Sequence, residues 1–343
     1  LSTLCAYPRP FLLDTCEIGA DSFSSFPFYF YLYLMILNDS PTIIPPYLQP
    51  GDTIGITCPA GYFCLDDMQP AKATLELWGY NVKLGKTIDG QYYTYSGTDE
   101  ERAADLQDML DDLEIKTILF GRGGYGCIRI IDKINFNQFY LHPKWLCGYS
   151  DITVIHSFVQ SQLHIPTLHC EMCIDLKYST TDESAMTIQQ AFRGDKLIYA
   201  VNPNQNNRKG SGKGLLIGGN LSLLIAQVGS DSDLDMDGKI LFIEDVHEYL
   251  YQIDSMMWTL KRAGKLAFLA GLVVGGMTRI QRDINDPPFG QSAYEIISDK
   301  VKEYDYPVCF GFPAGHQFNN FAIRLGMIHQ LSVNDNQAIL EET

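Results

Sequence analysis

The chain of 343 residues is long enough for two domains with separate cores, and its composition is that of a globular protein. Its net charge of −16 excludes the clustered basic surface that phosphate contacts to a nucleic acid require. The nine cysteines are odd in number and have no paired spacing, which favours a reducing compartment over a disulfide framework.

Residues 1–43 differ in composition from the rest of the chain, and we expect them to form an extension outside the folded domains. Their apolar stretch, FPFYFYLYLMIL at residues 26–37, is about half as long as a membrane-spanning helix. Acidic residues precede it and no small-residue cleavage site follows, so it does not fit a signal peptide. Because the sequence from Met35 onwards is typical of a protein start, we hypothesise that residues 1–34 are upstream sequence or a dispensable extension.

From Thr53 onwards, short apolar runs alternate with helical stretches. Thr98 fits a helix N-cap, because acidic residues fill the turn after it and suit the helix dipole. This alternation predicts a parallel, doubly wound α/β sheet, which we assign to an N-terminal domain over residues 44–173. The predicted strands are 53–58, 81–85, 115–120 and 144–149, and the predicted helical stretches are 68–79, 98–112, 127–134 and 152–163.

The second half of the chain predicts another, smaller α/β domain. Residues 174–213 turn polar and include NPNQNNRKGSGKG, which has no apolar periodicity and indicates a linker or surface loop. Strand and helix patterns return over residues 214–335, which we assign to the C-terminal domain. Its predicted units are 214–228, 239–246, 256–264, 269–277 and 306–315.

Two motifs match ligand-binding patterns without the context that these patterns need. GRGGYG at residues 121–126 fits G-x-G-x-x-G, but it follows the third predicted strand and lacks an acidic residue about twenty positions later. We therefore assign no nucleotide site, although its glycines let the backbone approach a bound group closely. His169, Cys170 and Cys173 form a Cys-x-x-Cys with a neighbouring histidine, but no second ligand pair follows, so no zinc site is expected.

The segment DLDMDGKILFIE matches the calcium-loop pattern D-x-D-x-D-G-x5-E in full, with Glu244 at its last position. An EF-hand needs a helix on both sides of its loop. Residues 239–246 are apolar and β-branched, which predicts Glu244 on a strand or at its end, and Gly229 interrupts the segment before the loop. We therefore expect an acidic turn that leads into a strand, with no bound metal.

Three residues at predicted strand ends have the chemistry of a serine hydrolase. Ser150 follows one strand, Glu244 ends another, and His316 follows a Pro-Ala-Gly turn after a third. Since a parallel α/β sheet gathers its active site at the carboxyl ends of its strands, a nucleophile, a base and an orienting acid can meet there. Taken singly, each residue has a plainer interpretation. Ser150 or Asp151 fits a helix cap, Glu244 a solvated strand end, and His316 a loop residue.

From about Ile44 to Val333 the chain resembles the LD-carboxypeptidase family in an ordered series of motifs. They are LQPGDTIGITCPAG, GTDEERAADLQDML, GRGGYG, KWLCGYSDIT, TLH, GLLIGGNLSLL, KILFIEDVHE and GFPAGH. The resemblance implies a glutamine-amidotransferase-like parallel sheet domain followed by a smaller swivelling α/β domain, usually in a homodimer. It also implies a serine peptidase that uses no metal and no cofactor.

By motif position, the resemblance implies a catalytic triad and an oxyanion hole of backbone amides. The triad falls on Ser150, His316 and Glu244, and the oxyanion amides fall on Asp151 and on Gly123 or Gly124. The implied reaction cuts the bond between the L-centre of a diamino acid and the terminal D-alanine of peptidoglycan tetrapeptides. Its implied setting is cell-wall recycling in the bacterial cytoplasm, with neither a membrane nor a nucleic acid as partner.

Two alternatives remain open. A relative of the microcin C self-immunity type would use the same triad on peptidyl nucleotides. Such enzymes prefer an aromatic platform between the serine and the glutamate, where this chain offers Tyr178 and Tyr199 but no tryptophan. A non-catalytic ligand-binding relative would have kept the fold alone.

The chain departs from the family pattern at two places. Cys170 and Glu171 replace Gly-Pro, and Ser255 replaces an arginine. Both departures bear on substrate contacts.

Overall fold

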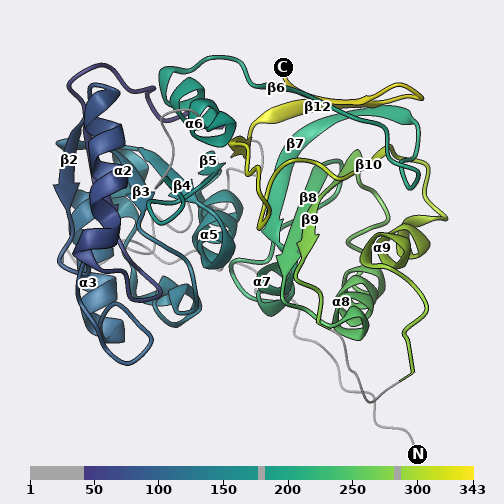
Figure 1. Cartoon of the computed structure of the whole chain (residues 1–343), viewed down its shortest axis with the longest axis horizontal. Coiled ribbons are helices and arrows are strands. Elements are labelled where there is room, and N and C mark those ends of the chain that lie inside the picture. Colours follow the sequence, from purple (N-terminus) through teal and green to yellow (C-terminus); the bar gives the residue numbers. More distant parts are fainter. Residues whose placement is uncertain (1–41, 177–181, 282–286) are drawn as a thin grey trace, which may run out of the picture. The chain divides into compact units, whose positions relative to one another are not determined.

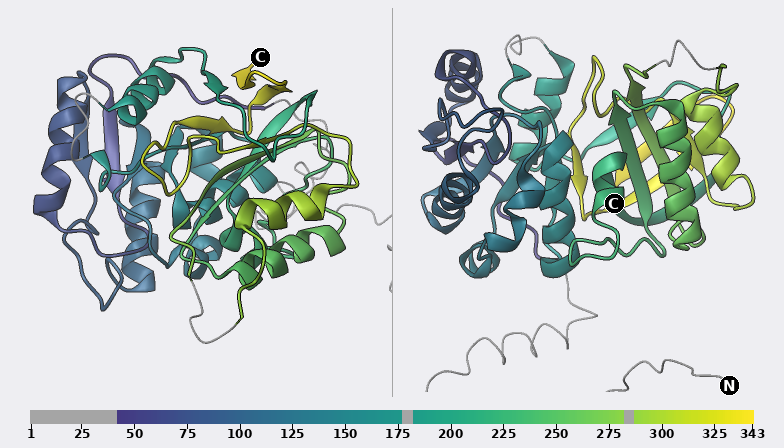
Figure 2. Two further views of the ribbon diagram at one scale, coloured as in Figure 1. Left: turned by 45° about the vertical axis from the view of Figure 1, so that its right-hand side comes forward. Right: turned by 90° about the horizontal axis from the view of Figure 1, so that it is seen from below.

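Two β-sheets with helices packed on them organise the described part of the chain (Figures 1 and 2). The computed structural model describes residues 42–176, 182–281 and 287–343. The chain from Thr42 onwards forms one compact unit. Residues 1–41 of the predicted N-terminal extension, Met35 among them, lie outside the described residues. Within the described ranges, no helix combines the length and the apolar character that a membrane crossing requires.

The first sheet has five parallel strands. Their spatial order is β5 (Thr167–His169), β4 (Trp145–Gly148), β3 (Ile115–Phe120), β1 (Thr53–Thr57) and β2 (Asn81–Leu84). Its helices are α2 (Leu65–Leu77), α3 (Asp99–Asp111), α4 (Asn137–Leu141) and α5 (Thr153–Leu163). Leu119 of β3 packs in the same core as α2, whereas its neighbours Ile118 and Phe120 pack in the core that contains α3 and α5. Helices thus cover both faces, which confirms the predicted doubly wound α/β sheet.

A strand from the far end of the chain completes the first sheet. Strand β11 (Ile323–Leu325) pairs antiparallel with β5, so that Ile323 lies opposite His169 and Leu325 opposite Thr167. These residues fall in the range predicted for the second domain, yet they belong to the sheet that carries the Ser150 turn. The predicted domain boundaries therefore stay a prediction.

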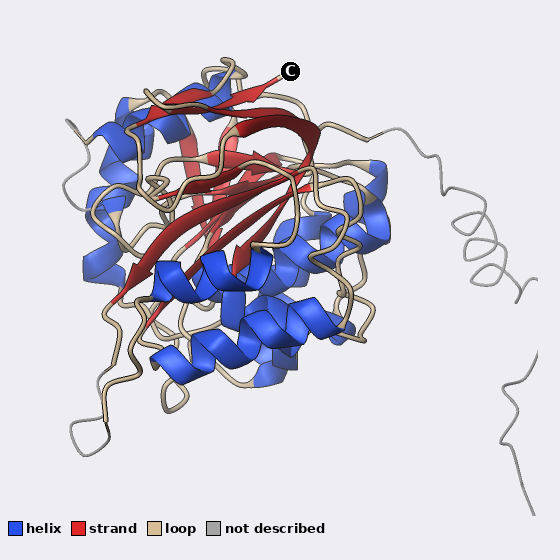
Figure 3. Cartoon of the chain, turned by 90° about the vertical axis from the view of Figure 1, so that its right-hand side faces the viewer, coloured by secondary structure: helices blue, strands red, loops and turns tan. Residues whose placement is uncertain are grey.

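The second sheet has a parallel part and an antiparallel part. The parallel strands are β7 (Gly210–Asn220), β8 (Ile240–Val246), β9 (Gly271–Thr278) and β10 (Val308–Phe310). The antiparallel strands are β12 (Ile328–Val333), β13 (Ala338–Glu342) and β6 (Ile198–Val201). The helices are α7 (Leu221–Ala226), α8 (Leu250–Arg262) and α9 (Ala293–Val301). Helices α8 and α9 lie side by side and share one core with β8 and β9 (Figures 1 and 3).

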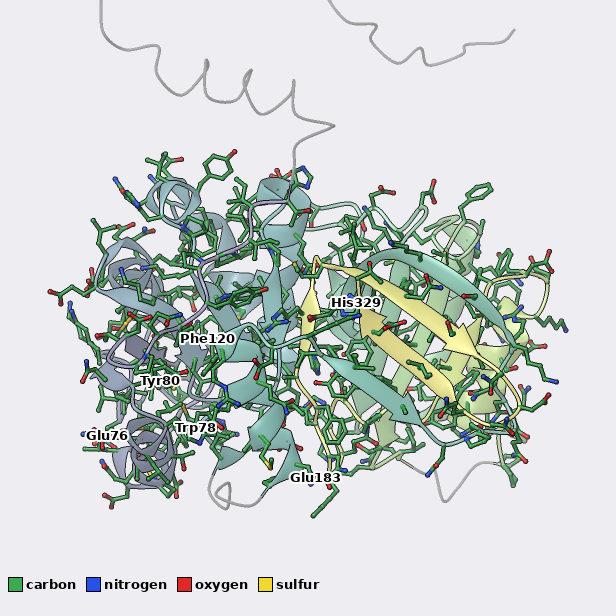
Figure 4. All side chains as sticks on the ribbon, turned by 90° about the horizontal axis from the view of Figure 1, so that it is seen from above. Glu76, Trp78, Tyr80, Phe120, Glu183 and His329 are labelled. Atoms are coloured by element: carbon green, nitrogen blue, oxygen red, sulfur yellow. The ribbon has the colours of Figure 1, made fainter. Side chains whose placement is uncertain are left out.

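The described residues between 182 and 213 are folded, which corrects the prediction of a plain linker over residues 174–213. Helix α6 (Glu183–Arg193) ends at Gly194, which has a positive φ of 80°. Its Phe192 packs edge-on against Trp78 and Tyr80 at ring-centroid distances of 6.5 and 6.0 Å. Trp78 and Tyr80 follow the end of α2 (Figure 4). Strand β6 then pairs with β13. The sequence of α6 contains an apolar face, but the polar residues that follow it made the whole segment look like a loop.

Two further expectations for local structure have different outcomes. The cap at Thr98 is confirmed as a capping box, because its hydroxyl accepts from the amide of Glu101 and the Glu101 carboxylate accepts from the amide of Thr98.

The prediction of a helix at residues 127–134 is wrong. These residues form two 3-10 turns, η1 (Cys127–Arg129) and η2 (Ile131–Lys133). This stretch is rich in isoleucine, whose restricted χ1 disfavours a longer helix.

Candidate active site

Ser150 lies in the turn between β4 and α5, as the first residue of the 3-10 turn η3 (Ser150–Ile152). Its φ angle is 62°, a left-handed conformation that costs a residue with a Cβ about 1–2 kcal/mol. No side chain caps α5, and the Asp151 carboxylate instead accepts a hydrogen bond from the amide of Cys127 at 2.8 Å. The helix-cap interpretation of Ser150 therefore fails, and its strained backbone points to a functional constraint.

Ser150, His316 and Glu244 come together from three strand ends. Nε2 of His316 lies 3.1 Å from Oγ of Ser150, and Nδ1 of His316 lies 2.7 Å from Oε2 of Glu244. The backbone amide of His316 also donates to the same oxygen at 3.0 Å, so the carboxylate orients both the ring and its main chain. A continuous chain of hydrogen bonds thus links a carboxylate, an imidazole and a hydroxyl.

The surroundings of Glu244 and His316 favour a negative charge on the carboxylate and a positive charge on the imidazole. Glu244 is fully buried, whereas 19% of the His316 side chain is exposed. Burial lowers the pKa of His316, but the charge and hydrogen bond of Glu244, with smaller effects of Asp245 and Asp175, raise the pKa above its ordinary value. Burial raises the pKa of Glu244, but the pairing with His316 lowers it overall. The carboxylate is therefore ionised and stabilises positive charge on the ring.

The loop after β10 requires glycine next to His316. Gly315 has a φ angle of 98°, and a Cβ at this position would lie 2.6 Å from Cβ of Glu244. The amide of Gly315 donates to Oδ1 of Asn320 at 2.7 Å, which fixes the loop. The ring of Tyr149 packs against the imidazole at a centroid distance of 4.8 Å. The glycine turn and this aromatic ring both restrict the position of His316.

The glycine loop after β3 lies against the nucleophile turn. A Cβ at Gly123 would lie 3.1 Å from Oγ of Ser150, whereas the atoms nearest to a Cβ at Gly124 belong to Gly61. The carbonyl of Gly123 accepts a hydrogen bond from the amide of Gly61 at 3.1 Å. Within the described ranges, the amides of Gly123 and Gly124 donate to no protein acceptor. Of the two glycines proposed for an oxyanion site, Gly123 is the one beside Ser150.

Asn220 and Asp245 surround Glu244, and sequence reasoning did not assign a role to either. Nδ2 of Asn220 donates to Oε1 of Glu244 at 3.3 Å and to Oδ1 of Asp245 at 3.0 Å. Burial, followed by the neighbouring charge of Glu244, raises the pKa of Asp245 to about 7. A signal for Asn220 existed, because it is the polar residue at the carboxyl end of β7, next to β8.

The residues of the two metal-like patterns have other surroundings. Glu244 lies within β8, as predicted, whereas Asp233 pairs with Lys265 at 2.7 Å and Asp235 pairs with Lys239 at 3.0 Å. His169, Cys170 and Cys173 are all buried. In the part of the chain that the structure describes, no group of three or more His, Cys, Asp or Glu side chains is arranged to hold a metal ion.

Comparison with known proteins gives consistent matches over both sheets. Models of the LD-carboxypeptidase N-terminal and C-terminal domains match residues 54–170 and 213–331. The probable murein peptide carboxypeptidase of Bacillus subtilis (strain 168) is 33% identical over 307 residues, which are 87% of this chain and 94% of that protein. The first match contains Ser150, and the second contains Glu244 and His316.

Two further similarities concern a solved structure and a more distant relative. The crystal structure of muramoyltetrapeptide carboxypeptidase from Oxalobacter formigenes has the same fold, with a TM-score of 0.77 at 24% identity over 84% of this chain and 98% of that chain. The microcin C7 self-immunity protein MccF of Escherichia coli is 23% identical over 328 residues, which are 85% of this chain and 94% of that protein.

Proposed function

Because the chain belongs to the LD-carboxypeptidase family of peptidases, we propose that it is a serine carboxypeptidase that removes the terminal D-alanine from peptidoglycan tetrapeptides. The observation that carries the proposal is the chain of hydrogen bonds from Glu244 through His316 to Ser150, with distances of 2.7 and 3.1 Å. The similar proteins of Bacillus subtilis and Oxalobacter formigenes are named for murein peptides, which supports such a peptide as the substrate. The bond that is cut joins the third residue, an L-centred diamino acid, to D-alanine.

The acylation step uses all three side chains. Oγ of Ser150 attacks the carbonyl carbon of the third residue, and Nε2 of His316 takes the hydroxyl proton. Glu244 holds Nδ1 and stabilises the imidazolium. The amides of Asp151 and Gly123 are the proposed donors to the oxyanion, each contributing about 3 kcal/mol of transition-state stabilisation. His316 then protonates the departing nitrogen, the C–N bond breaks, and D-alanine leaves an acyl ester on Ser150.

Deacylation repeats the same proton transfers with water. His316 takes a proton from the attacking water and returns it to Oγ of Ser150 as the ester bond breaks. The products are a tripeptide with a free carboxylate and the restored enzyme. No step of this reaction requires a metal or a cofactor. We further propose a homodimer that acts in cell-wall recycling in the bacterial cytoplasm, which follows from the family resemblance.

A peptidyl nucleotide is the alternative substrate, and one observation disfavours it. Tyr199, which sequence analysis considered as part of a nucleobase platform, is only 9% exposed and donates its hydroxyl to the carbonyl of Ala322 at 2.6 Å. It is therefore a core residue and offers no stacking surface. The other candidate, Tyr178, lies outside the described residues. The peptide substrate is the better supported of the two.

D-Alanine release from L-Ala-γ-D-Glu-diaminopimelate-D-Ala and from its lysine counterpart, followed by mass spectrometry, tests the proposal. We expect the wild type to remove one alanine and Ser150→Ala to remove none. Ser157→Ala, which changes a buried serine on α5 away from the chain of hydrogen bonds, is the matched control and should keep activity. Release by Ser150→Ala would contradict the mechanism. Cleavage of an aminoacyl nucleotide analogue without release from either peptide would support the alternative.

A further inference from the structure

Glu171 lies beside the nucleophile turn and has a carboxylate oxygen that no described group satisfies. The amide of Cys170 donates to the carbonyl of Gly148 at 3.3 Å, and Cε of Met172 lies 3.4 Å from the place of a Cβ at Gly123. These contacts hold the segment around Glu171 against the turn. Glu171 itself is only 5% exposed, and its Oε2 is buried without a hydrogen-bond partner among the described residues.

Two more carboxylates surround Glu171. Asp175 accepts hydrogen bonds from the hydroxyl of Tyr149 at 3.4 Å and from the amide of Met172 at 3.1 Å, and Asp182 stands at the N-cap of α6. Burial, and then the negative charges of Asp182 and Asp175, raise the pKa of Glu171 to about 8. A buried acid with like-charged neighbours and no cation of its own destabilises a fold, so such a group indicates a binding site for positive charge.

One of these carboxylates, Asp175, acts on the catalytic residues. The charge of Asp175 contributes to the raised pKa of His316, and Tyr149, which donates to Asp175, packs on the His316 ring. In the proposed reaction Ser150 attacks the carbonyl carbon of the third residue of the peptide. The side chain of that residue branches from the neighbouring carbon, so its binding surface lies next to the nucleophile turn. Glu171 belongs to the segment that packs on this turn.

We infer that Glu171, with Asp175 and Asp182 around it, forms an acidic subsite that binds the side-chain ammonium group of the third residue. The inference rests on the proposed function and specifies its substrate class. A lysine side chain brings an ammonium group alone, which stabilises the ionised form of Glu171, whereas diaminopimelate also brings a distal carboxylate that the negative charges of Asp175 and Asp182 repel. The enzyme therefore prefers lysine-type tetrapeptides to diaminopimelate-type tetrapeptides.

Four tetrapeptides that differ only in the third residue test this inference. Lysine carries the ammonium group, norleucine removes it, diaminopimelate adds a carboxylate, and distally amidated diaminopimelate neutralises that carboxylate. For the wild type we expect kcat/KM for the lysine peptide to exceed that for the norleucine peptide about tenfold or more, mainly through KM. The diaminopimelate peptide should be cleaved less well than its amidated form.

Charge removal at one position then locates the subsite. Glu171→Gln keeps the shape of the side chain and should bring the lysine-to-norleucine ratio close to one. Glu183→Gln, at an exposed glutamate in the first turn of α6, is the matched control and should leave the ratio unchanged (Figure 4). Equal cleavage of the lysine and norleucine peptides by the wild type overturns the subsite but leaves the proposed function intact. Failure of the wild type to cleave any of the four overturns both. Because the wild-type comparison needs no variant, the inference stays testable even if Glu171→Gln does not fold.

Discussion

Glu244 and Asp245 are consecutive residues of β8, yet both side chains are buried and Nδ2 of Asn220 donates a hydrogen bond to each of them. Successive residues of a regular strand point to opposite faces of the sheet. The pairing of β8 with β9 shifts register between Ile243 and Asp245, which breaks this alternation. The consequence is a pair of neighbouring acids with opposite pKa shifts, because only Glu244 has the imidazole of His316 as a partner.

Asp245→Asn should gain stability relative to the wild type as the pH rises. The pKa of Asp245 is raised to about 7 in the folded protein, so its contribution to stability is present below about pH 4 and is lost as pH rises through 7. The variant does not lose stability in this way. We therefore expect its free energy of unfolding, relative to that of the wild type, to rise by an amount on the order of a few kcal/mol between pH 4 and pH 8. Urea unfolding at both pH values measures it. If the variant and the wild type differed by the same free energy of unfolding at both pH values, the raised pKa of Asp245 would be contradicted.

Glu244→Gln should change both the rate and its pH dependence. Neutral His316 acts as the base, so kcat/KM rises with pH through the pKa of His316, which Glu244 raises above 6.5. Without the negative charge this pKa falls, so the acid limb should move to lower pH, while kcat drops about 10⁴-fold. Glu248→Gln, two residues beyond β8, is the control. An acid limb at an unchanged pH in Glu244→Gln would be inconsistent with the hydrogen-bonded pair.

Ser150→Gly should be more stable than Ser150→Ala by about 1 kcal/mol, although both lack activity. Both variants remove the hydroxyl and its hydrogen bond to His316, so the comparison isolates the backbone at φ 62°. Glycine adopts this conformation without strain, whereas alanine keeps the Cβ that opposes it. Thermal unfolding of the two purified variants gives the difference. Equal or reversed stabilities would show that the turn stores no strain.

Gly315→Ala should impair both stability and catalysis, whereas Gly264→Ala should affect stability alone. Both glycines have positive φ angles, 98° and 77°, but only at Gly315 would a Cβ meet Glu244, at 2.6 Å, since a Cβ at Gly264 has no atom within 4 Å. We expect about 1 kcal/mol of destabilisation at Gly264 and at least 1 kcal/mol more at Gly315, where kcat should also fall about 100-fold. Similar kcat values in the two variants would exclude steric displacement of Glu244.

The first sheet could be predicted from sequence because its strands and helices carry strong local patterns. The apolar run of β3 and the capping box at Thr98 are each visible within a few residues. Strand β11 has no such signal. It is three residues long, and it is a strand only because β5, far away in sequence, pairs with it. Helix α6 was missed for a different reason, since its pattern was averaged with the polar loop that follows.

The candidate site was partly predictable from residue types and their places at strand ends. This reasoning selected Ser150, Glu244 and His316, which the structure brings within hydrogen-bonding distance, while their catalytic role stays a prediction. It could not detect the positive φ of Ser150 or the pairing of Asn220 with two acids, because both depend on backbone geometry and long-range packing. An asparagine alone carries no chemical signature of such a role.

The late position of β11 affects how the protein folds as it is synthesised. A ribosome that has finished the N-terminal strands has made a sheet whose β5 edge still exposes unpaired amide and carbonyl groups. The groups on that edge stay unpaired until Ile323–Leu325 have been synthesised, and by then Glu244 and His316 have also been made. The nascent chain therefore carries an aggregation-prone edge before Ser150, Glu244 and His316 can come together. The chain that supplies His316 and the chain that pairs with the β5 edge are consequently made within the same ten residues, 316–325.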